Sequence, residues 1–354
     1  MNKKIVLTGG GTAGHVTPNI ALMPALKERG FDLHYIGSYE GIERSLINQC
    51  GIPYYPVSSG KMRRYKSFKN FTDIFRILKG FFDSVKHLRK IQPAAVFSKG
   101  GYVVVPVTFA ARILGIPVVI HESDITPGLA NRLIIPFAEK ICVSFPETLN
   151  YLPKDKGVIT GTPIRAELWE GSKEKGLEIC GFDKLTPKPV VLATGGSQGS
   201  VAINKQIIST LPKLLEKFHV IHLCGDGNVR DSLRDGYAPF EYAKDDLPHL
   251  LAAADVVVSR AGANTIFELL ALAKPNILIP LPKHASRGDQ LLNAESFENQ
   301  GFSMLINEDD LEDNMLYERI TELYDNRELY VNKMKASNKG NGVDAVVSAI
   351  VGAL

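Results

Sequence analysis

Short runs of apolar, β-branched residues recur along the chain, and a glycine-rich turn and a helix-length segment follow most of them. The clearest run is DVVVS at residues 255–259, which predicts a buried parallel strand. A helix over residues 265–273 and a second strand over 276–280 are predicted to follow. Because ligands bind beyond the carboxyl ends of strands in open α/β sheets, the polar loops 259–264 and 283–290 predict a site for a hydroxyl-rich ligand. A pair of solvated loops on a Rossmann-type domain is the alternative.

The order of strand, glycine turn and helix opens both halves of the chain. Residues 3–8 predict a first strand, and the glycine-rich turn 9–15 leads into a predicted helix. Residues 189–193 predict a strand again, and the turn 194–200 follows it. This repeated pattern predicts an α/β fold with two Rossmann-like, doubly wound parallel-sheet lobes that face each other across a cleft.

The segment GTPIR at residues 161–165 is predicted to join the two lobes. We expect the N-terminal lobe to comprise residues 1–162 and 338–354, and the C-terminal lobe to comprise residues 163–337. Arg165 in the joining segment is either an ordinary surface residue or an anion ligand.

Length and composition are those of a soluble globular protein. A chain of 354 residues exceeds a single typical core and favours two domains. The four cysteines are scattered without a CxxC pair, which argues for a reducing compartment and against a metal cluster. The opening sequence MNKKIVLTGG holds too short an apolar run for a signal peptide, and no run approaches the ~20 residues that span a membrane. We therefore expect a cytoplasmic protein.

Positive charge is concentrated in one segment. The net charge of the chain is only +3, but residues 61–90 contain ten Lys or Arg and two Asp, so that this segment carries +8 and the remainder −5. Such an asymmetry predicts an anionic partner on one face.

The same basic segment carries an apolar stripe at helical spacing. Its members are Phe68, Phe71, Phe75, Leu78, Phe82 and Val85. Ile74 and Phe81 widen the stripe beyond a single core-facing seam. One interpretation is a packed helix with a solvated basic face, and the other is a peripheral membrane surface that meets anionic lipid.

The first glycine turn, GGGTAGH at residues 9–15, matches the dinucleotide-binding fingerprint GxGxxG. Glycines there let backbone N–H groups and a helix N-terminus approach a phosphate. The acid that a nicotinamide site places after the next strand has only Glu40 as a candidate. His15, at the mouth of the turn, is either a helix-terminus histidine or a catalytic residue.

Three motifs that hold metals or phosphates are absent from the sequence: Asp-x-Asp, HExxH and the Walker pattern GxxxxGK[ST]. We therefore expect neither a metal nor a cofactor. A nucleotide diphosphate is predicted to be held by backbone N–H groups, helix dipoles and Arg165.

Seven motifs in order between residues 9 and 294 resemble one family. They are GGGTAGHVTP, KGGYVVVP, HES, GTPIR, TGGSQGS, SRAGANTIFELLALAKPNILIPLP and DQLLNA. The chain is similar in these motifs to glycosyltransferase family 28 enzymes that convert lipid I to lipid II in peptidoglycan synthesis. The resemblance implies a GT-B fold and inverting transfer of N-acetylglucosamine from UDP-GlcNAc to the C4 hydroxyl of the N-acetylmuramoyl unit. It also implies a peripheral protein on the cytoplasmic face of the cell membrane, with no nucleic-acid partner.

The resemblance further implies a role for individual residues. His15 and Glu122 are the catalytic candidates, either of them as the general base. The acceptor diphosphate is expected at Gly11, Gly100, Gly101 and Tyr102. UDP-GlcNAc is expected at Thr12, Ala13, Gly14, Arg165, Ser197, Lys244, Ala263, Asn264, Thr265, Ile266, Glu268 and Gln290. Among these, Glu268 is expected to hold the ribose hydroxyls and Gln290 the sugar, while the Lys244 backbone and Ala263–Ile266 are expected to surround the uracil and diphosphate.

Two positions depart from the family pattern. Gly-Gly-His is Ala13–Gly14–His15 here, and His-Glu-Gln-Asn is His121–Glu122–Ser123–Asp124, so that an acid replaces a neutral amide. Other interpretations remain open at this point. They are another GT-B enzyme with a lipid acceptor, an NAD-dependent oxidoreductase, and a noncatalytic nucleotide-sugar sensor.

Overall fold

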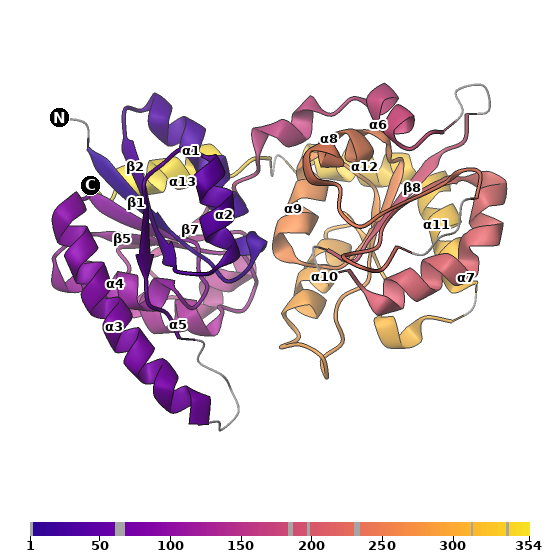
Figure 1. Ribbon diagram of the computed structural model, residues 1–354. Helices are drawn as coiled ribbons and strands as arrows, with labels where there is room; N and C mark the ends of the chain where they lie inside the picture. Colours follow the sequence, from indigo (N-terminus) through magenta and orange to yellow (C-terminus); the bar gives the residue numbers. More distant parts are fainter. Residues whose placement is uncertain are drawn as a thin grey trace. The chain divides into compact units, whose positions relative to one another are not determined.

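The computed structural model divides the chain into two compact units (Figure 1). Unit 1 comprises Met1–Arg165 and Asn341–Leu354, and unit 2 comprises Ala166–Gly340. Each boundary lies a few residues beyond the one expected from the sequence. The structure describes residues 3–60, 68–182, 187–196, 199–229, 234–312, 314–337 and 340–354.

Unit 1 is built on a parallel sheet with seven strands in its described part, in the order β3-β2-β1-β4-β5-β6-β7. The strands are β1 Lys4–Thr8, β2 Asp32–Ser38, β3 Tyr54–Val57, β4 Ala95–Ser98, β5 Val118–Glu122, β6 Lys140–Val143 and β7 Gly157–Ile159. The order runs outward in opposite directions from β1 and β4, so that the topological switch point lies between these two strands. Thr8 and Ser98 are partners in the register and end the two strands side by side. The turns that follow them therefore begin at the switch point, where open α/β sheets bind ligands.

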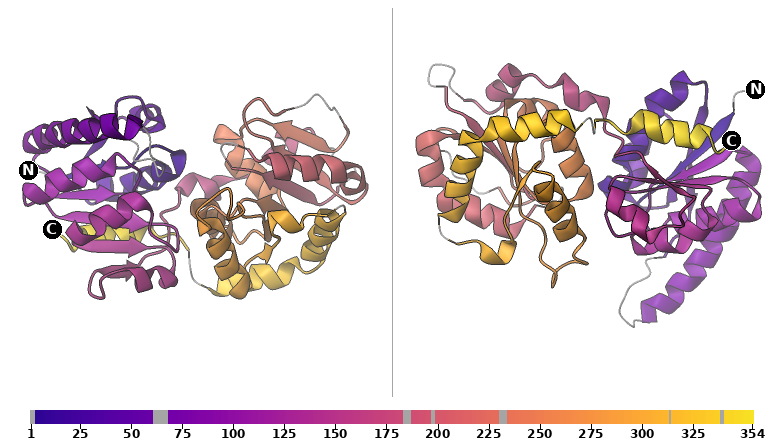
Figure 2. Two further views of the ribbon diagram at one scale, coloured as in Figure 1. Left: turned by 90° about the horizontal axis from the view of Figure 1, so that it is seen from below. Right: turned by 180° about the vertical axis from the view of Figure 1, so that it is seen from behind.

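Helices cover both faces of this sheet (Figures 1 and 2). They are η1 Ala13–His15, α1 Thr17–Glu28, α2 Ile42–Gln49, α3 Phe68–Ile91, α4 Val104–Ile113, α5 Leu129–Ile134, η2 Ile135–Phe137, η3 Pro146–Tyr151 and α13 Val343–Val351. α1 and α13 pack together with Ile5 and Leu7, whereas α3 and α4 pack with Val6 and Ile36 on the opposite face. Alternate residues of β1 thus enter opposite cores, as the period of a strand requires.

Unit 2 repeats the plan with six parallel strands in its described part, in the order β10-β9-β8-β11-β12-β13. The strands are β8 Val190–Thr194, β9 His219–Leu223, β10 Tyr237–Phe240, β11 Val256–Ser259, β12 Asn276–Leu278 and β13 Met304–Leu305. The helices are η4 Ala166–Glu170, α6 Lys173–Ile179, α7 Val201–Lys217, η5 Lys244–Asp246, α8 Leu247–Ala253, α9 Ala263–Ala271, α10 Asp289–Asn299, η6 Glu308–Asp310, α11 Met315–Asp325 and α12 Arg327–Ala336. The switch point lies between β8 and β11, and α7 and α9 begin after the turns that follow these strands. The predicted pair of doubly wound lobes is confirmed.

Three members of the apolar stripe on α3 face solvent, whereas Val85 packs against the core cluster. Phe75, Leu78 and Phe82 are 60%, 51% and 68% exposed. The buried side of the helix is instead the face of Gly80 and Leu88. A Cβ at Gly80 would lie 1.9 Å from the Ser58 carbonyl oxygen, so that the helix packs there without room for a side chain. The interpretation as a core seam is wrong for these three residues, whereas the side chains of Phe68 and Phe71 lie outside the described set.

Among the described residues, no helix combines the length and the apolar character that crossing a membrane requires.

Candidate functional site

The turns after β1 and β4 pack backbone against backbone at the switch point of unit 1. The N–H of Gly10 donates to the Gly100 carbonyl oxygen over 3.3 Å. Gly101 has φ +85°, and a Cβ there would lie 2.0 Å from the Gly10 oxygen. Only glycine fits this position, both because of its dihedral angle and because of the contact. The structure thus brings together the predicted glycines of the acceptor site.

A buried carboxylate that the sequence analysis missed holds the first of these turns. Glu43, in the first turn of α2, is fully buried. Its Oε2 accepts from the Gly11 N–H over 3.2 Å, and its Oε1 accepts from the Ser38 N–H over 3.0 Å. A Cβ at Gly10 would lie 2.5 Å from Glu43 Oε1. The glycines of the turn therefore make room for Glu43 as well as for a ligand.

The ring of Tyr102 lies beside Gly11 of the same turn. A Cβ at Gly11, where φ is +88°, would lie 2.7 Å from Cε1 of Tyr102. Burial, and secondarily the charge of Glu43, raises the pKa of the Tyr102 hydroxyl. The phenol is therefore neutral at physiological pH and can donate a hydrogen bond. Tyr102 and Gly11 lie together, as the prediction of a shared acceptor site requires.

His15 ends the 3-10 helix η1 beside the two glycine turns. Its Nδ1 lies 3.1 Å from the Gly10 carbonyl oxygen and 3.1 Å from Oγ1 of Thr12. Because a carbonyl only accepts, the pairing with Gly10 places the proton on Nδ1 and makes Nε2 the acceptor of the neutral ring. A Cβ at Gly100 would lie 3.4 Å from Cδ2 of His15. The Gly10 carbonyl therefore sets the tautomer of the neutral ring, and the absence of a side chain at Gly100 leaves room beside it.

Thr12, Ala13 and Gly14 belong to the same turn as His15. Thr12 is exposed, and Ala13 and Gly14 are half-buried. Their backbone lies at the carboxyl end of β1, in the position predicted for a ligand contact.

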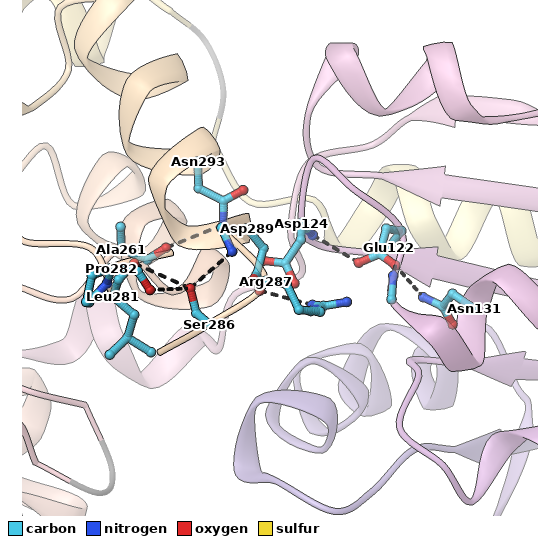
Figure 3. A network of polar contacts seen from close by, with 12 residues as sticks. Glu122, Asp124, Asn131, Ala261, Leu281, Pro282, Ser286, Arg287, Asp289 and Asn293 are labelled. Atoms are coloured by element: carbon cyan, nitrogen blue, oxygen red, sulfur yellow. Dashed lines mark hydrogen bonds and ion pairs between the residues drawn. The ribbon is translucent and has the colours of Figure 1, made fainter. Parts of the chain in front are cut away.

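Glu122, the second catalytic candidate, is buried and hydrogen-bonded within its own turn (Figure 3). Its Oε1 accepts from the Asp124 N–H over 3.0 Å, and its Oε2 accepts from the Gly128 N–H over 2.9 Å. The Asn131 side chain on α5 donates to Oε2 over 2.8 Å. Asn131 and His15 border the same space beside the second glycine turn, because a Cβ at Gly100 would lie 3.5 Å from Oδ1 of Asn131 and 3.4 Å from Cδ2 of His15. The Glu122–Asn131 pair therefore lies near His15.

In unit 2, α9 begins at Gly262 without a side-chain cap. Gly262 has φ −67°, and a Cβ there would meet nothing within 4 Å. Neither the backbone nor the packing requires glycine at this position. The missing side chain leaves open space beside the N-terminus of α9, the end of a helix that attracts anions.

The predicted donor residues on α9 divide between two faces of the helix. Ala263 and Ile266 are buried, so that only their backbone can reach a ligand. Asn264, Thr265 and Glu268 are half-buried, and Glu268 follows Thr265 by three residues and Asn264 by four, so that its side chain is a neighbour of both on the helix surface. The structure thus places the polar members of the predicted donor set in the first two turns of α9.

Gln290 lies at the start of α10, after the loop that follows β12. Its Oε1 accepts from the Leu281 N–H over 3.1 Å, which leaves the two N–H groups of its amide as the donors for a ligand. Ser286 folds the intervening loop by donating to the Pro282 oxygen over 3.1 Å (Figure 3). Arg287 and Asp289 form an ion pair over 3.0 Å in the same loop.

Arg260, a polar residue of the other predicted ligand loop, is committed to the protein itself. Its Nη1 donates to the carbonyl oxygens of Ile279 and Pro280 over 3.1 and 3.2 Å and pairs with Glu308. This guanidinium joins the ends of β11 and β12 to each other and is structural.

The remaining predicted donor residues are described only in part. Ser197 lies outside the described residues. Ser200, three residues later, caps α7 with its hydroxyl, which accepts from the Ile203 N–H over 3.3 Å. Lys244 begins η5, but its side chain is not described. Arg165 is half-buried and is the last residue of the first segment of unit 1.

No group of three or more His, Cys, Asp or Glu side chains that could hold a metal occurs in the described ranges.

The two doubly wound parallel-sheet units have the fold of GT-B glycosyltransferases. The chain belongs to glycosyltransferase family 28, because the N-terminal domain of that family matches residues 5–143 and its C-terminal domain matches residues 190–348. The alternative of an NAD-dependent oxidoreductase is thereby set aside.

Two relatives match almost the whole chain. A protein of Clostridium tetani is 55% identical over 99% of this chain and 98% of its own length. One of Lachnoclostridium phytofermentans is 58% identical over 98% of each. Both are named UDP-N-acetylglucosamine--N-acetylmuramyl-(pentapeptide) pyrophosphoryl-undecaprenol N-acetylglucosamine transferase.

Solved structures agree on the fold. A crystal structure of Acinetobacter baumannii MurG has a TM-score of 0.75 and 26% identity, covering 98% of this chain and 99% of that one. The glycosyltransferase of kitacinnamycin has a TM-score of 0.72 at 15% identity, covering 98% of each chain, which shows the shared fold alone.

Proposed function

We propose that this protein transfers N-acetylglucosamine from UDP-GlcNAc to lipid I and so forms lipid II in peptidoglycan synthesis. The observation that carries the proposal is the 55–58% identity, over nearly the full chain, to proteins named for this transfer. The C4 hydroxyl of the N-acetylmuramoyl unit attacks the anomeric carbon of the donor from the face opposite UDP. The new C1–O bond forms as the bond to the UDP oxygen breaks, the hydroxyl proton passes to a base, and the configuration inverts from α to β.

His15 is the general base of this proposal. The hydrogen bond between its Nδ1 and the Gly10 oxygen supports the role, because it makes Nε2 the proton acceptor. Glu122 is the weaker candidate, since three donors from its own turn and from α5 already occupy its two oxygens. We assign Glu122 the positioning of the turn that precedes α5.

Donor binding is assigned to the N-terminus of α9 and the start of α10. The open Gly262 end of α9 supports binding of the diphosphate, whose negative charge suits the helix dipole. Glu268, on the same helix, offers a carboxylate to the paired ribose hydroxyls, and the Gln290 amide offers donors to the sugar. Arg165 and Ser197 stay in the proposal as contacts of UDP, and Lys244 as a backbone contact of uracil.

Acceptor binding is assigned to the two glycine turns of unit 1. The Gly11 N–H is already donated to Glu43, so this glycine contributes room and not a hydrogen bond. Gly100 and Gly101 have φ of +100° and +85° and precede the N-terminus of α4. Their shape and the neutral Tyr102 hydroxyl suit the diphosphate of lipid I.

Membrane docking is assigned to the basic segment 61–90, whose described residues belong to α3. The N-terminal part of α3 extends away from the rest of unit 1 (Figures 1 and 2). Exposed Phe75, Leu78 and Phe82 stand among the exposed basic residues of the same helix, and this combination suits an anionic bilayer surface. The exposed basic residues are Arg76, Lys79, Lys86, Arg89 and Lys90.

Incubation of the purified protein with radiolabelled UDP-GlcNAc and lipid I tests the proposal. We expect label in lipid II, with release of UDP, and we expect it to persist in excess EDTA because no metal-binding motif is present in the sequence. Labelled UDP-GlcNAc that binds but never transfers would support a nucleotide-sugar sensor instead. Transfer to another lipid acceptor, with none to lipid I, would support a different GT-B enzyme.

A further inference from the structure

Lys99 is a buried cation at the switch point of unit 1 that the reaction described above does not use. It follows β4 directly and is 2% exposed. Its N–H donates to the Thr8 oxygen over 2.9 Å, which ties its backbone to the end of β1. Its ammonium donates to the hydroxyl of Ser123, in the turn after β5. Lys99 therefore links the neighbouring strand ends β1, β4 and β5 at the edge where the acceptor is proposed to bind.

The charges around Lys99 come from β5 and the turn after it. Glu122 and Asp124 attract the ammonium from that turn, and His121 lies behind them at the end of β5. From the β1 side the neighbour is Gly9, where a Cβ would lie 3.3 Å from Cβ of Lys99, and it carries no titratable group. Burial, and then the charge of Lys99, lowers the pKa of His121 well below its ordinary range. His121 is therefore neutral, and Lys99 is the cation that faces the two acids.

Ser123 is the middle of a turn with many further contacts. Glu122 accepts from Asp124 and Gly128 within the turn and from Asn131 beyond it. Asn131 in turn borders the space beside Gly100 that the ring of His15 also borders, at 3.5 and 3.4 Å from the place that a Cβ would take. A movement of this turn would therefore displace a side chain that lies next to both the second glycine turn and His15.

We propose that Lys99 is a positioning residue for the acceptor, whose ammonium holds the turn 122–128 through Ser123 and through its attraction to Glu122 and Asp124. The inference rests on the proposed function, because it concerns the binding of lipid I. Lys99 is assigned no direct role in substrate binding, since its side chain is buried. Removal of its charge leaves two neighbouring carboxylates without their cation, and the turn must then move or take up a proton.

The state of Lys99 then depends on pH. Burial lowers the pKa of its ammonium to about 8, although Glu122 and Asp124 oppose that shift. The lysine is charged below this pH and neutral above it. We therefore expect kcat/KM for lipid I to fall as the pH rises through about 8, in step with the loss of the ammonium.

The test compares Lys99→Met and Lys99→Arg with the wild-type protein between pH 6.5 and 9.5. For Lys99→Met at pH 7 we expect kcat/KM for lipid I to fall by about 10- to 100-fold, the range that a small misplacement of reacting groups produces. KM for UDP-GlcNAc should stay unchanged. Lys99→Arg should keep activity above pH 8, because arginine retains its charge there. Lys27→Met, on the exposed side of α1, is the matched control and should behave as the wild type.

Specific results would overturn the inference. Lys99→Met with wild-type kcat/KM for lipid I, or a fall with pH that is the same in the wild type and in Lys99→Arg, would show that the charge does not position the acceptor. If Lys99→Met does not fold, as judged by UDP binding and circular dichroism, the pH profiles of the wild type and Lys99→Arg decide alone. A wild-type protein that transfers nothing to lipid I at any pH would contradict the proposed function and not the role of Lys99.

Discussion

The side chain of Asn131 donates a hydrogen bond of 2.8 Å to Oε2 of Glu122, and both groups are buried. A buried carboxylate in this position is stabilised only as long as its donors remain, because its desolvation is not otherwise offset. The same amide and the His15 ring border one space beside Gly100, at 3.5 and 3.4 Å from the place that a Cβ would take. The pair therefore places the turn before α5 near the catalytic candidate on η1.

Asn131→Ala removes this donor and should destabilise the protein by about 1.5–3 kcal/mol, the range for hydrogen bonds to charged groups. Transfer to lipid I should fall as well, because the Asn131 amide also lies beside the second glycine turn. Thermal unfolding and acceptor kinetics are the measurements, with Asn48→Ala on the exposed side of α2 as the control. Unchanged melting and kinetics in Asn131→Ala would separate this amide from the site.

His15→Asn tests the general base. The Asn amide can still donate to the Gly10 oxygen, as Nδ1 of His15 does, but it offers no basic nitrogen. We expect kcat to fall by about 10²- to 10⁴-fold, the usual contribution of a general base, while UDP binding stays as it was. If Glu122→Gln loses far more kcat than His15→Asn does, with both proteins folded, the assignment of the base must be reversed.

Glu268→Ala tests the donor site. A carboxylate that accepts from paired ribose hydroxyls contributes roughly 1.5–3 kcal/mol, so UDP affinity should fall by about one to two decades. Isothermal titration with UDP measures this change, and Glu295→Ala on the exposed side of α10 is the control. A titration curve equal to that of the wild type would remove Glu268 from the donor site.

The doubly wound fold could be predicted because its strands carry a local signal. β11, Val256–Ser259, is a β-branched run followed closely by a glycine, as a buried parallel strand before a turn should be. β10 was not predicted, since Tyr237–Phe240 is short and contains Pro239. The sheet tolerates this proline because β10 is an edge strand, where one side of the backbone needs no partner.

The site was only partly predictable, because several of its contacts join residues that are far apart in the sequence. Glycine turns can be recognised in the sequence, because positions with a positive φ, such as Gly101, favour glycine. Glu43 does not, because the Gly11 N–H that it accepts lies 32 residues away in sequence. Lys99 and Ser123 are 24 residues apart and meet only once β4 and β5 are paired. No local pattern signals such contacts.

The orientation of α3 shows a different limit. Its helical period reveals apolar stripes but not which stripe enters the core. Phe81 and Val85 pack against the core cluster, while Phe75 and Phe82 face solvent. The choice is made by Gly80, whose missing side chain lets the helix approach the Ser58 carbonyl.

The exposed stripe of α3 leads to the last prediction, which concerns binding to anionic vesicles. Phe75→Ser with Phe82→Ser should shorten the residence on the vesicle, since burial of each such side chain is worth up to roughly 1.5–3 kcal/mol. Replacement of Arg76, Lys79 and Lys86 by Gln should weaken recruitment, because each cation near an anionic surface contributes ~1 kcal/mol. UDP affinity should remain intact in both variants, because none of the substituted residues on α3 is among the residues proposed to bind UDP.

Vesicle sedimentation at two salt concentrations separates the two contributions. Salt screens the charges over a Debye length but leaves the buried Phe contacts unaffected, so that high salt should release the wild type only in part and the Phe variant almost fully. Leu329→Ser on α12, which removes a leucine that is 63% exposed in unit 2, is the matched control for the loss of an exposed apolar side chain. Sedimentation that responds to neither set of substitutions and not to salt would move the docking surface away from α3, and the exposed Phe75 and Phe82 would then need another partner.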